Sequence, residues 1–181
     1  IIVVLHFVRS ALGTQTSPPN QVLIGIALFL TLFIMAPVMT QINKDCIQPY
    51  DKGKLTQEEA LNAGLKPIRK FMFEQTDRKD IRLFMEIEKQ SNDVSIEKED
   101  EIPTLVLIPA FMISELRIAF IIGFLIYLPF IVIDMVVAST LMSMGMMMLP
   151  PTTISMPFKI LLFVLADGWN LVIGQLVKTF Y

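Results

Sequence analysis

This sequence is short of the residues on which most enzymes and metal proteins depend. Among its 181 residues it has a single cysteine, Cys46, and a single histidine, His6. One of each cannot build a Cys/His metal cluster, and a lone cysteine cannot close an intrachain disulfide. The sequence contains no glycine-rich phosphate loop and no nucleophile-elbow pattern. We therefore expect a protein that is not an enzyme and that binds no cofactor or metal.

Charge is also scarce, and it is segregated. Charged residues make up 18% of the chain, against about 25% in ordinary soluble domains. Hydrophobic residues make up 54%, the mean hydropathy is +0.61, and the net charge is −2. This balance excludes the basic surface that nucleic-acid binding requires. Of the 32 charged residues, 25 lie between positions 43 and 101, which leaves the two ends of the chain strongly apolar.

Three apolar stretches stand out, at residues 22–39, 118–149 and 158–177. A run of about 18 apolar residues is a candidate membrane span. The second stretch is too long for one upright span, since 32 residues of helix reach about 48 Å and the hydrocarbon core is about 30 Å thick. Pro129 lies near its middle and predicts a kink. We predict an all-α fold made of kinked helical hairpins in a membrane-associated protein, together with a small charged helical module.

The segregation of charge divides the chain into three regions. We predict an N-terminal apolar helical region at 1–42, a charged extramembrane helical module at 43–103, and C-terminal apolar hairpins at 104–181. In the module, Thr56 and Glu59 predict a capping box, Pro67 predicts the start of a second helix, and the acidic stretch 90–101 predicts a linker. The cations Lys66, Arg69 and Lys70 form either a partner-binding patch or a solvated helix face, and the interleaved acids favour the second.

The most distinctive segment holds five methionines within seven positions, residues 142–148. Methionine is unbranched and polarizable, so a cluster of it makes a soft apolar surface that fits irregular shapes. Gly145 allows the backbone to bend, and Pro150 and Pro151 end any helix that precedes them. We predict a deformable loop that would form a compliant seal if several copies converge on an axis. The alternative is that these methionines are lipid-facing or fill the core.

Five charges lie isolated in the apolar parts of the chain: Glu115, Arg117, Asp134, Lys159 and Asp167. An ionisable group at the centre of a membrane helix costs about 2.5–3.5 kcal/mol, so it usually has a partner. Glu115 and Lys159 flank the long apolar hairpin and are the candidate inter-subunit charge pair, although Lys159 could instead reach toward water. Arg117, Asp134 and Asp167 are further candidates for burial. We expect Asp134 to find a donor at a subunit interface or on its own neighbouring helix.

Several separated motifs resemble the FliP/SctR family, core subunits of the type III secretion export gate. They are RSALGTQ at 9–15, PPNQVLIG at 18–25, LFLT at 28–31, APV at 36–38, LIPAF at 107–111, SELR at 114–117, LPF at 128–130, VID at 132–134, MSMGMMMLPP at 142–151, PFK at 157–159 and DGWNL at 167–171. The resemblance covers nearly the whole chain. The proline pairs at 18–19 and 150–151 favour the flagellar branch of the family.

The resemblance implies a homopentamer that joins two smaller export-gate subunits and other export-apparatus membrane proteins. It implies that unfolded flagellar proteins pass through the assembly, and that Met144, Met146, Met147 and Met148 form its pore constriction. It also implies contact with membrane lipid and a place in the flagellar basal body at the bacterial inner membrane, displaced toward the periplasmic side. A cleaved signal peptide is expected before Ile1.

A second class of function stays open from the residues alone. A proton- or ion-conducting membrane protein would use Glu115, Asp134 and Asp167 as relay carboxylates. A relay needs carboxylates within reach of one another, whereas these three are spread along the chain beside basic residues. The sequence therefore favours a non-enzymatic pore subunit for protein export.

Overall fold

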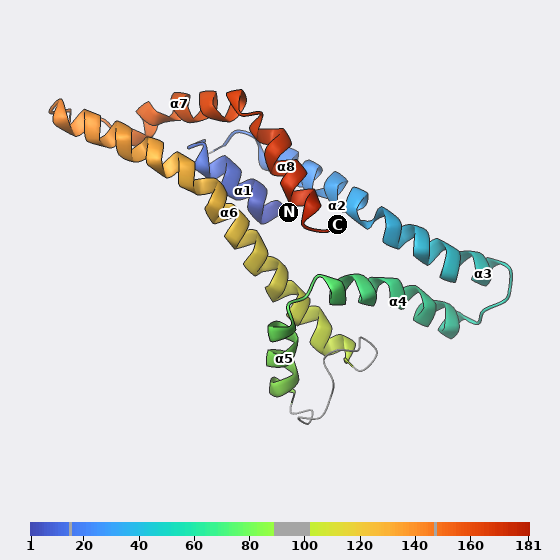
Figure 1. The fold of residues 1–181 in the computed structure, drawn as a ribbon. Helices are drawn as coiled ribbons and strands as arrows, with labels where there is room; N and C mark the ends of the chain where they lie inside the picture. The colour runs from blue at the N-terminus through green and yellow to red at the C-terminus, as the bar shows by residue number, and fades with distance from the viewer. Residues whose placement is uncertain (15, 89–101, 147) are drawn as a thin grey trace. The chain divides into compact units, whose positions relative to one another are not determined.

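A computed structural model describes residues 1–14, 16–88, 102–146 and 148–181 of the chain. Every regular element in that part of the chain is helical, which confirms the predicted all-α class (Figure 1). In chain order the elements are α1 (Ile2–Ala11), α2 (Asn20–Ile42), the π-helix η1 (Asn43–Ile47), α3 (Gln48–Asp51), α4 (Gln57–Glu74), α5 (Arg78–Ile87), α6 (Thr104–Ser143), α7 (Pro151–Leu165) and α8 (Gly168–Lys178).

The helices form two compact units. The first consists of Ile1–Thr31 and Ala119–Tyr181, and the second is Leu32–Ile118. Helices α2 and α6 each run from one unit into the other. These units are defined by packing, whereas the three predicted regions were drawn from hydropathy, so the predicted division stays a prediction.

Helix α1 forms the centre of the first unit. Its residues Val4, Leu5 and Val8 are completely buried. Phe7 packs so closely on α6 that a Cβ added to Gly123 would lie 2.4 Å from the Phe7 ring. A side chain at position 123 would therefore force the two helices apart, which explains why glycine suits this position.

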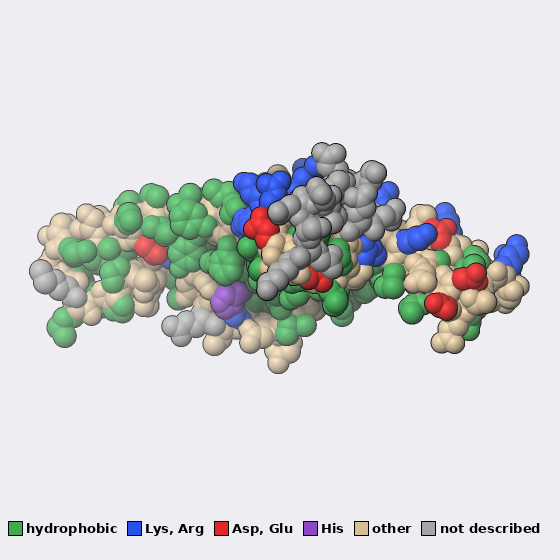
Figure 2. Space-filling view, turned by 90° about the horizontal axis from the view of Figure 1, so that it is seen from below, with side chains coloured by type: hydrophobic (Ala, Val, Ile, Leu, Met, Phe, Trp, Pro, Cys, Tyr) green, Lys and Arg blue, Asp and Glu red, His purple; other side chains and the backbone are tan. Residues whose placement is uncertain are grey.

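Within the described residues, two helical segments are each long and apolar enough to cross a membrane. They are Asn20–Asp51, which contains α2, η1 and α3, and Thr104–Ser143, which is α6. Their most apolar windows have a mean hydropathy of 2.6. Many of their large side chains are exposed, among them Phe29 and Phe124, and hydrophobic side chains cover much of the visible face (Figure 2). The apolar surface is what a membrane-associated protein presents to lipid or to partner proteins.

Helix α6 continues through Pro129 as one element of 40 residues. A continuous helix does not test the kink predicted at this proline, which stays a prediction. Proline removes one backbone hydrogen bond and costs a helix interior about 3 kcal/mol. Packing on both sides of the proline opposes that cost, because Phe130 lies in a buried cluster with Val8 and Phe163. The helix ends instead at the methionine segment.

The third apolar stretch is broken in two. Helices α7 and α8 meet at an angle of 64° around Ala166 and Asp167. Asp167 adopts a left-handed backbone conformation with φ 50°, which ends one helix and begins the next. Gly168 follows in close contact with the Phe163 ring, where an added Cβ would lie only 2.4 Å from a ring carbon.

The charged helices α4 and α5 belong to the second unit. The predicted capping box is confirmed, because the Thr56 hydroxyl accepts from the Glu59 N–H and the Glu59 carboxylate accepts from the Thr56 N–H. The predicted helix start at Pro67 is wrong, since α4 runs through that proline to Glu74. The break comes at Asp77, whose side chain caps α5. The expected linker at 90–101 lies outside the described residues.

Candidate functional site

The methionine segment forms the connection between α6 and α7. Gly145 has φ +76°, a left-handed conformation that glycine adopts without strain. Its N–H donates to the Met142 carbonyl, and the Met146 N–H donates to the Leu141 carbonyl. This pair of hydrogen bonds is the Schellman motif that closes a helix C-terminus. The loop-shaping role predicted for Gly145 thus has a specific geometry.

Two prolines define the far side of the same loop. Pro150 is the N-cap of α7 in an extended conformation, and Pro151 occupies the first helical position. Proline suits that position because its missing N–H would have no partner in the first turn of a helix. The methionine loop, residues 144–150, is therefore short and held by a helix end on each side.

The loop presents its methionines to the outside of the chain. Met148 is 98% exposed and Met144 is 71% exposed, and Met146 is exposed as well. Met147 lies outside the described residues. Such exposure is unusual for a large apolar side chain in a single chain, and it marks this loop as a surface for contact with other apolar groups. Whether the methionines line a pore constriction is a prediction that a single chain does not test.

A buried charge pair joins the two helices on either side of the loop. The Lys159 ammonium on α7 lies 2.6 Å from a carboxylate oxygen of Asp134 on α6, and the Ser155 hydroxyl donates to the other oxygen of that carboxylate. Lys159 is 2% exposed and Ser155 is completely buried. On the same two helices the rings of Phe130 and Phe163 pack together, with centroids 6.3 Å apart. The donor of Asp134 thus comes from the neighbouring helix, one of the two placements expected from the sequence.

The predicted pair between Glu115 and Lys159 concerns two different chains, so it remains a prediction. Within one chain Lys159 binds Asp134. An ammonium has three N–H donors, and the contact with Asp134 uses one of them. Glu115 is half-buried, and no hydrogen bond or ion pair of its side chain occurs among the described residues. Lys159 is only 2% exposed, so Glu115 of a neighbouring chain would reach it only if the hairpin opened in the assembly.

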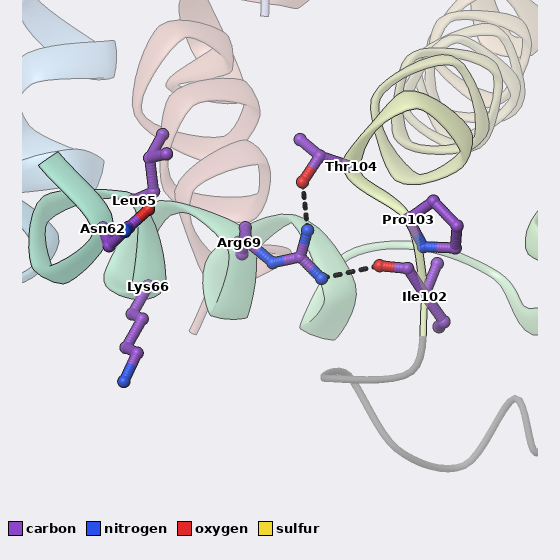
Figure 3. Close-up of a pocket in the computed structure, with 7 residues that line it drawn as sticks. All are labelled: Asn62, Leu65, Lys66, Arg69, Ile102, Pro103 and Thr104. Atoms are coloured by element: carbon purple, nitrogen blue, oxygen red, sulfur yellow. Dashed lines mark hydrogen bonds between the residues drawn. The ribbon is translucent and has the colours of Figure 1, made fainter. Parts of the chain in front are cut away.

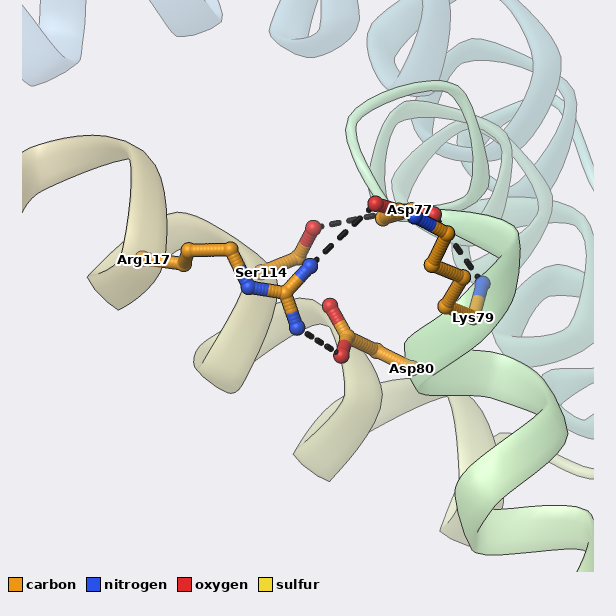
Figure 4. A network of polar contacts seen from close by, with 5 residues as sticks. All are labelled: Asp77, Lys79, Asp80, Ser114 and Arg117. Atoms are coloured by element: carbon orange, nitrogen blue, oxygen red, sulfur yellow. Dashed lines mark hydrogen bonds and ion pairs between the residues drawn. The ribbon is translucent and has the colours of Figure 1, made fainter. Parts of the chain in front are cut away.

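The other two isolated charges are exposed in the single chain. Arg117 binds the carboxylates of Asp77 and Asp80, and the Ser114 hydroxyl accepts the Asp77 backbone N–H at 2.8 Å (Figure 4). This network fixes the start of α5 against α6. Asp167 accepts from the Asn170 amide at 2.9 Å. The predicted burial of Arg117 and Asp167 can therefore occur only through contact with another molecule.

The second unit has an open cleft of about 550 Å³, lined by Asn62, Leu65, Lys66, Arg69, Ile102, Pro103 and Thr104 (Figure 3). The Arg69 guanidinium donates to the Thr104 hydroxyl and to the Ile102 carbonyl. It therefore ties α4 to the start of α6 and is not simply a solvated cation. Lys66 is exposed, and Lys70 lies 3.8 Å from Glu74 in a solvent-exposed ion pair.

No group of three or more His, Cys, Asp or Glu residues that could hold a metal ion occurs within the described residues. The main feature of this region is the apolar hairpin of α6 and α7, which has exposed methionines at its tip and a charge pair between its two helices.

The sequence of this hairpin is shared with a known family. A sequence model of the FliP family matches residues 1–176. The chain belongs to the FliP family. The flagellar biosynthetic protein FliP of Bacillus subtilis is 54% identical over 180 residues, which cover 99% of this chain and 80% of that protein.

Two further FliP proteins show similar agreement. FliP of Pectobacterium carotovorum is 48% identical over 181 residues, covering all of this chain and 69% of the relative. FliP of Buchnera aphidicola subsp. Baizongia pistaciae is 50% identical over 181 residues, covering all of this chain and 49% of the relative. All three relatives are named flagellar biosynthetic proteins. The resemblance to the FliP family, and its flagellar branch, are thereby confirmed.

Proposed function

We propose that this chain is a pore-forming core subunit of the flagellar type III protein export gate, and that its methionine loop seals the closed channel. One observation carries the proposal: a short loop, fixed at both ends by helix caps, exposes large flexible apolar side chains at the tip of a hairpin. Thioether side chains adapt to irregular surfaces, so converging loops can close a gap and still yield to a passing polypeptide.

The proposed assembly is a homopentamer that joins two smaller export-gate subunits and other membrane proteins of the export apparatus. A closed ring uses two different surfaces of each chain, one facing each neighbour. The exposed apolar side chains of α2, α6 and α7 offer such surfaces, among them Phe33, Leu125 and Leu161. Unfolded flagellar proteins would pass along the axis of the ring.

The proposed location is the flagellar basal body at the bacterial inner membrane, displaced toward the periplasmic side. Helix length supports the displacement. The 40 residues of α6 extend about 60 Å at about 1.5 Å per residue, twice the hydrocarbon thickness of about 30 Å. A helix of this length fits a protein assembly better than it fits a bilayer, so we expect most of its apolar surface to contact neighbouring subunits.

Proton or ion conduction through Glu115, Asp134 and Asp167 gains no support from the structure. Asp134 is engaged with a buried lysine, and Asp167 is exposed at the junction of α7 and α8. A relay needs carboxylates within reach of one another, and the side chain of Asp134 contacts Lys159 and Ser155.

The seal is tested by shortening its side chains. Replacing Met146, Met147 and Met148 with Ala should leave the complex assembled and make the closed channel leak small ions, measured as membrane conductance in cells. The matched control replaces Met112 and Met135, which are exposed on α6 outside the loop, with Ala. Unchanged conductance in an assembled triple variant would refute the sealing role, and loss of assembly would show that the methionines fill a core.

A further inference from the structure

The only histidine of the chain lies beside a buried arginine. The Nδ1 atom of His6 is 3.0 Å from a terminal nitrogen of Arg9, one turn further along α1. Arg9 is only 9% exposed, whereas the His6 ring is exposed to solvent. An arginine guanidinium carries donors only, so a hydrogen bond between the two requires His6 Nδ1 to act as the acceptor. The contact therefore requires a neutral imidazole with its proton on Nε2.

The same arginine holds the chain between α1 and α2. Its other terminal nitrogen donates to the side-chain oxygen of Asn20 at 2.6 Å and to the Pro18 carbonyl at 3.3 Å, and the Arg9 carbonyl accepts from the Thr14 hydroxyl. Asn20 is the first residue of α2. Arg9 thus connects the end of one helix to the start of the next, and His6 orients Arg9 from the opposite side.

Within the described residues, the side chains of His6 and Arg9 form no hydrogen bond or ion pair with a carboxylate. The charged groups on the elements that pack against α1 in this unit are Asp134 of α6, Lys159 of α7, and Asp167 and Lys178 at the two ends of α8. Asp134 binds Lys159, and Asp167 accepts from Asn170. Both carboxylates therefore have partners other than His6.

We propose that His6 is a pH sensor for the α1–α2 connection. Histidine ordinarily changes its charge between pH 5 and 8. Protonation converts Nδ1 from acceptor to donor, which removes the hydrogen bond and sets two cations face to face. Arginine keeps its proton throughout this range, so the imidazolium must turn away into solvent. Arg9 then loses one of its acceptors, and its hydrogen bonds to Pro18 and Asn20 become less restrained.

Hydrogen exchange of the purified full chain in detergent tests this proposal. Between pH 7.5 and pH 5.5, amide protection in the peptide covering residues 12–22 should fall about three- to tenfold, after correction for intrinsic exchange rates, as loss of one hydrogen bond implies. His6→Gln keeps an acceptor that does not titrate, so its protection should stay constant. His6→Lys should show low protection at both pH values. The peptide covering Gln57–Glu74, in the other unit, reports whether each variant is folded.

The outcomes separate the proposal from a general effect of acid. An equal fall in wild type and His6→Gln would overturn it, because the change would then not require the imidazole. Constant protection in wild type would overturn it as well. Full protection in His6→Lys at pH 7.5 would show that a cation at position 6 does not release the connection.

Discussion

The charge pair between Asp134 and Lys159 makes a prediction about asymmetry. Both partners belong to one hairpin, but Lys159 is 2% exposed while the Asp134 side chain is 26% exposed. Removing one partner of a buried pair costs about 3–5 kcal/mol, mostly because the remaining charge is stranded. Asp134→Ala leaves a buried ammonium without its carboxylate, so we expect this substitution to lower the free energy of unfolding by the full range of about 3–5 kcal/mol.

The reverse substitution should cost less. Lys159→Ala leaves a carboxylate that is partly solvated and still accepts from Ser155, so we expect about 1–3 kcal/mol. Replacing both partners with apolar residues, Asp134→Leu with Lys159→Met, should restore most of the stability, since an apolar pair of similar volume is often neutral in place of a buried ion pair.

Hydrogen exchange of the α7 amides measures this difference at the hairpin itself. The matched control is Lys178→Met, which removes an exposed lysine at the end of α8 and should change protection little. The explanation would be refuted if Asp134→Ala were no more destabilising than Lys159→Ala, or if the double apolar variant were worse than Asp134→Ala alone. The first result would refute the predicted asymmetry, and the second would mean that the two charges do not depend on each other.

Three other predictions follow from single features of the structure. Gly145→Ala should destabilise the end of α6 by about 1 kcal/mol because of the positive φ alone, since no described atom lies within 4 Å of the added Cβ. Gly25→Ala inside α2 should be neutral or stabilising, and thermal unfolding compares the two variants. The pKa of Glu59 is lowered by hydrogen bonds from the Thr56 backbone N–H and hydroxyl. The stabilisation of α4 by Glu59 is therefore complete above the ordinary glutamate pKa and is lost as the pH falls through the lowered value. Amide protection in the first turn of α4 should fall between pH 6 and pH 3 in wild type and stay flatter in Glu59→Gln. Glu115→Lys should impair assembly or export if Glu115 meets Lys159 of a neighbouring chain, and adding Lys159→Glu should restore part of it; a double variant no better than either single one would end that pairing.

Hydropathy and caps predicted much of the fold. The apolar stretches became α2, α6 and the α7–α8 pair, and Thr56 with Glu59 began a helix as expected. Pro67 was overestimated as a helix boundary, because α4 continues through it to Glu74. A proline lowers the stability of its helix by a fixed local amount. The packing that offsets this loss comes from residues distant in the sequence, so the sequence around the proline does not reveal it.

The loop was easier to predict than the charge pair. Gly145 and the two prolines are local signals, and each acts through its own backbone conformation. The partner of Lys159 depends on the register of the hairpin. Asp134 lies ten residues before Met144, and Lys159 lies nine residues after Pro150, so an antiparallel hairpin brings them level. That symmetry about the loop was the available signal, and it favours Asp134 over Glu115 as the partner within one chain.

Disulfide crosslinking at the loop tip tests the central claim most directly. Cys46 is the only cysteine, so Cys46→Ser gives a cysteine-free background in which Met148→Cys places one thiol at the most exposed of the described methionines. If the loops of several copies converge on an axis, mild oxidation of the assembled complex should link neighbouring chains into dimers. Leu165→Cys, at another highly exposed position, is the control and should link far less. Efficient crosslinking at 165 with none at 148 would contradict the methionine seal.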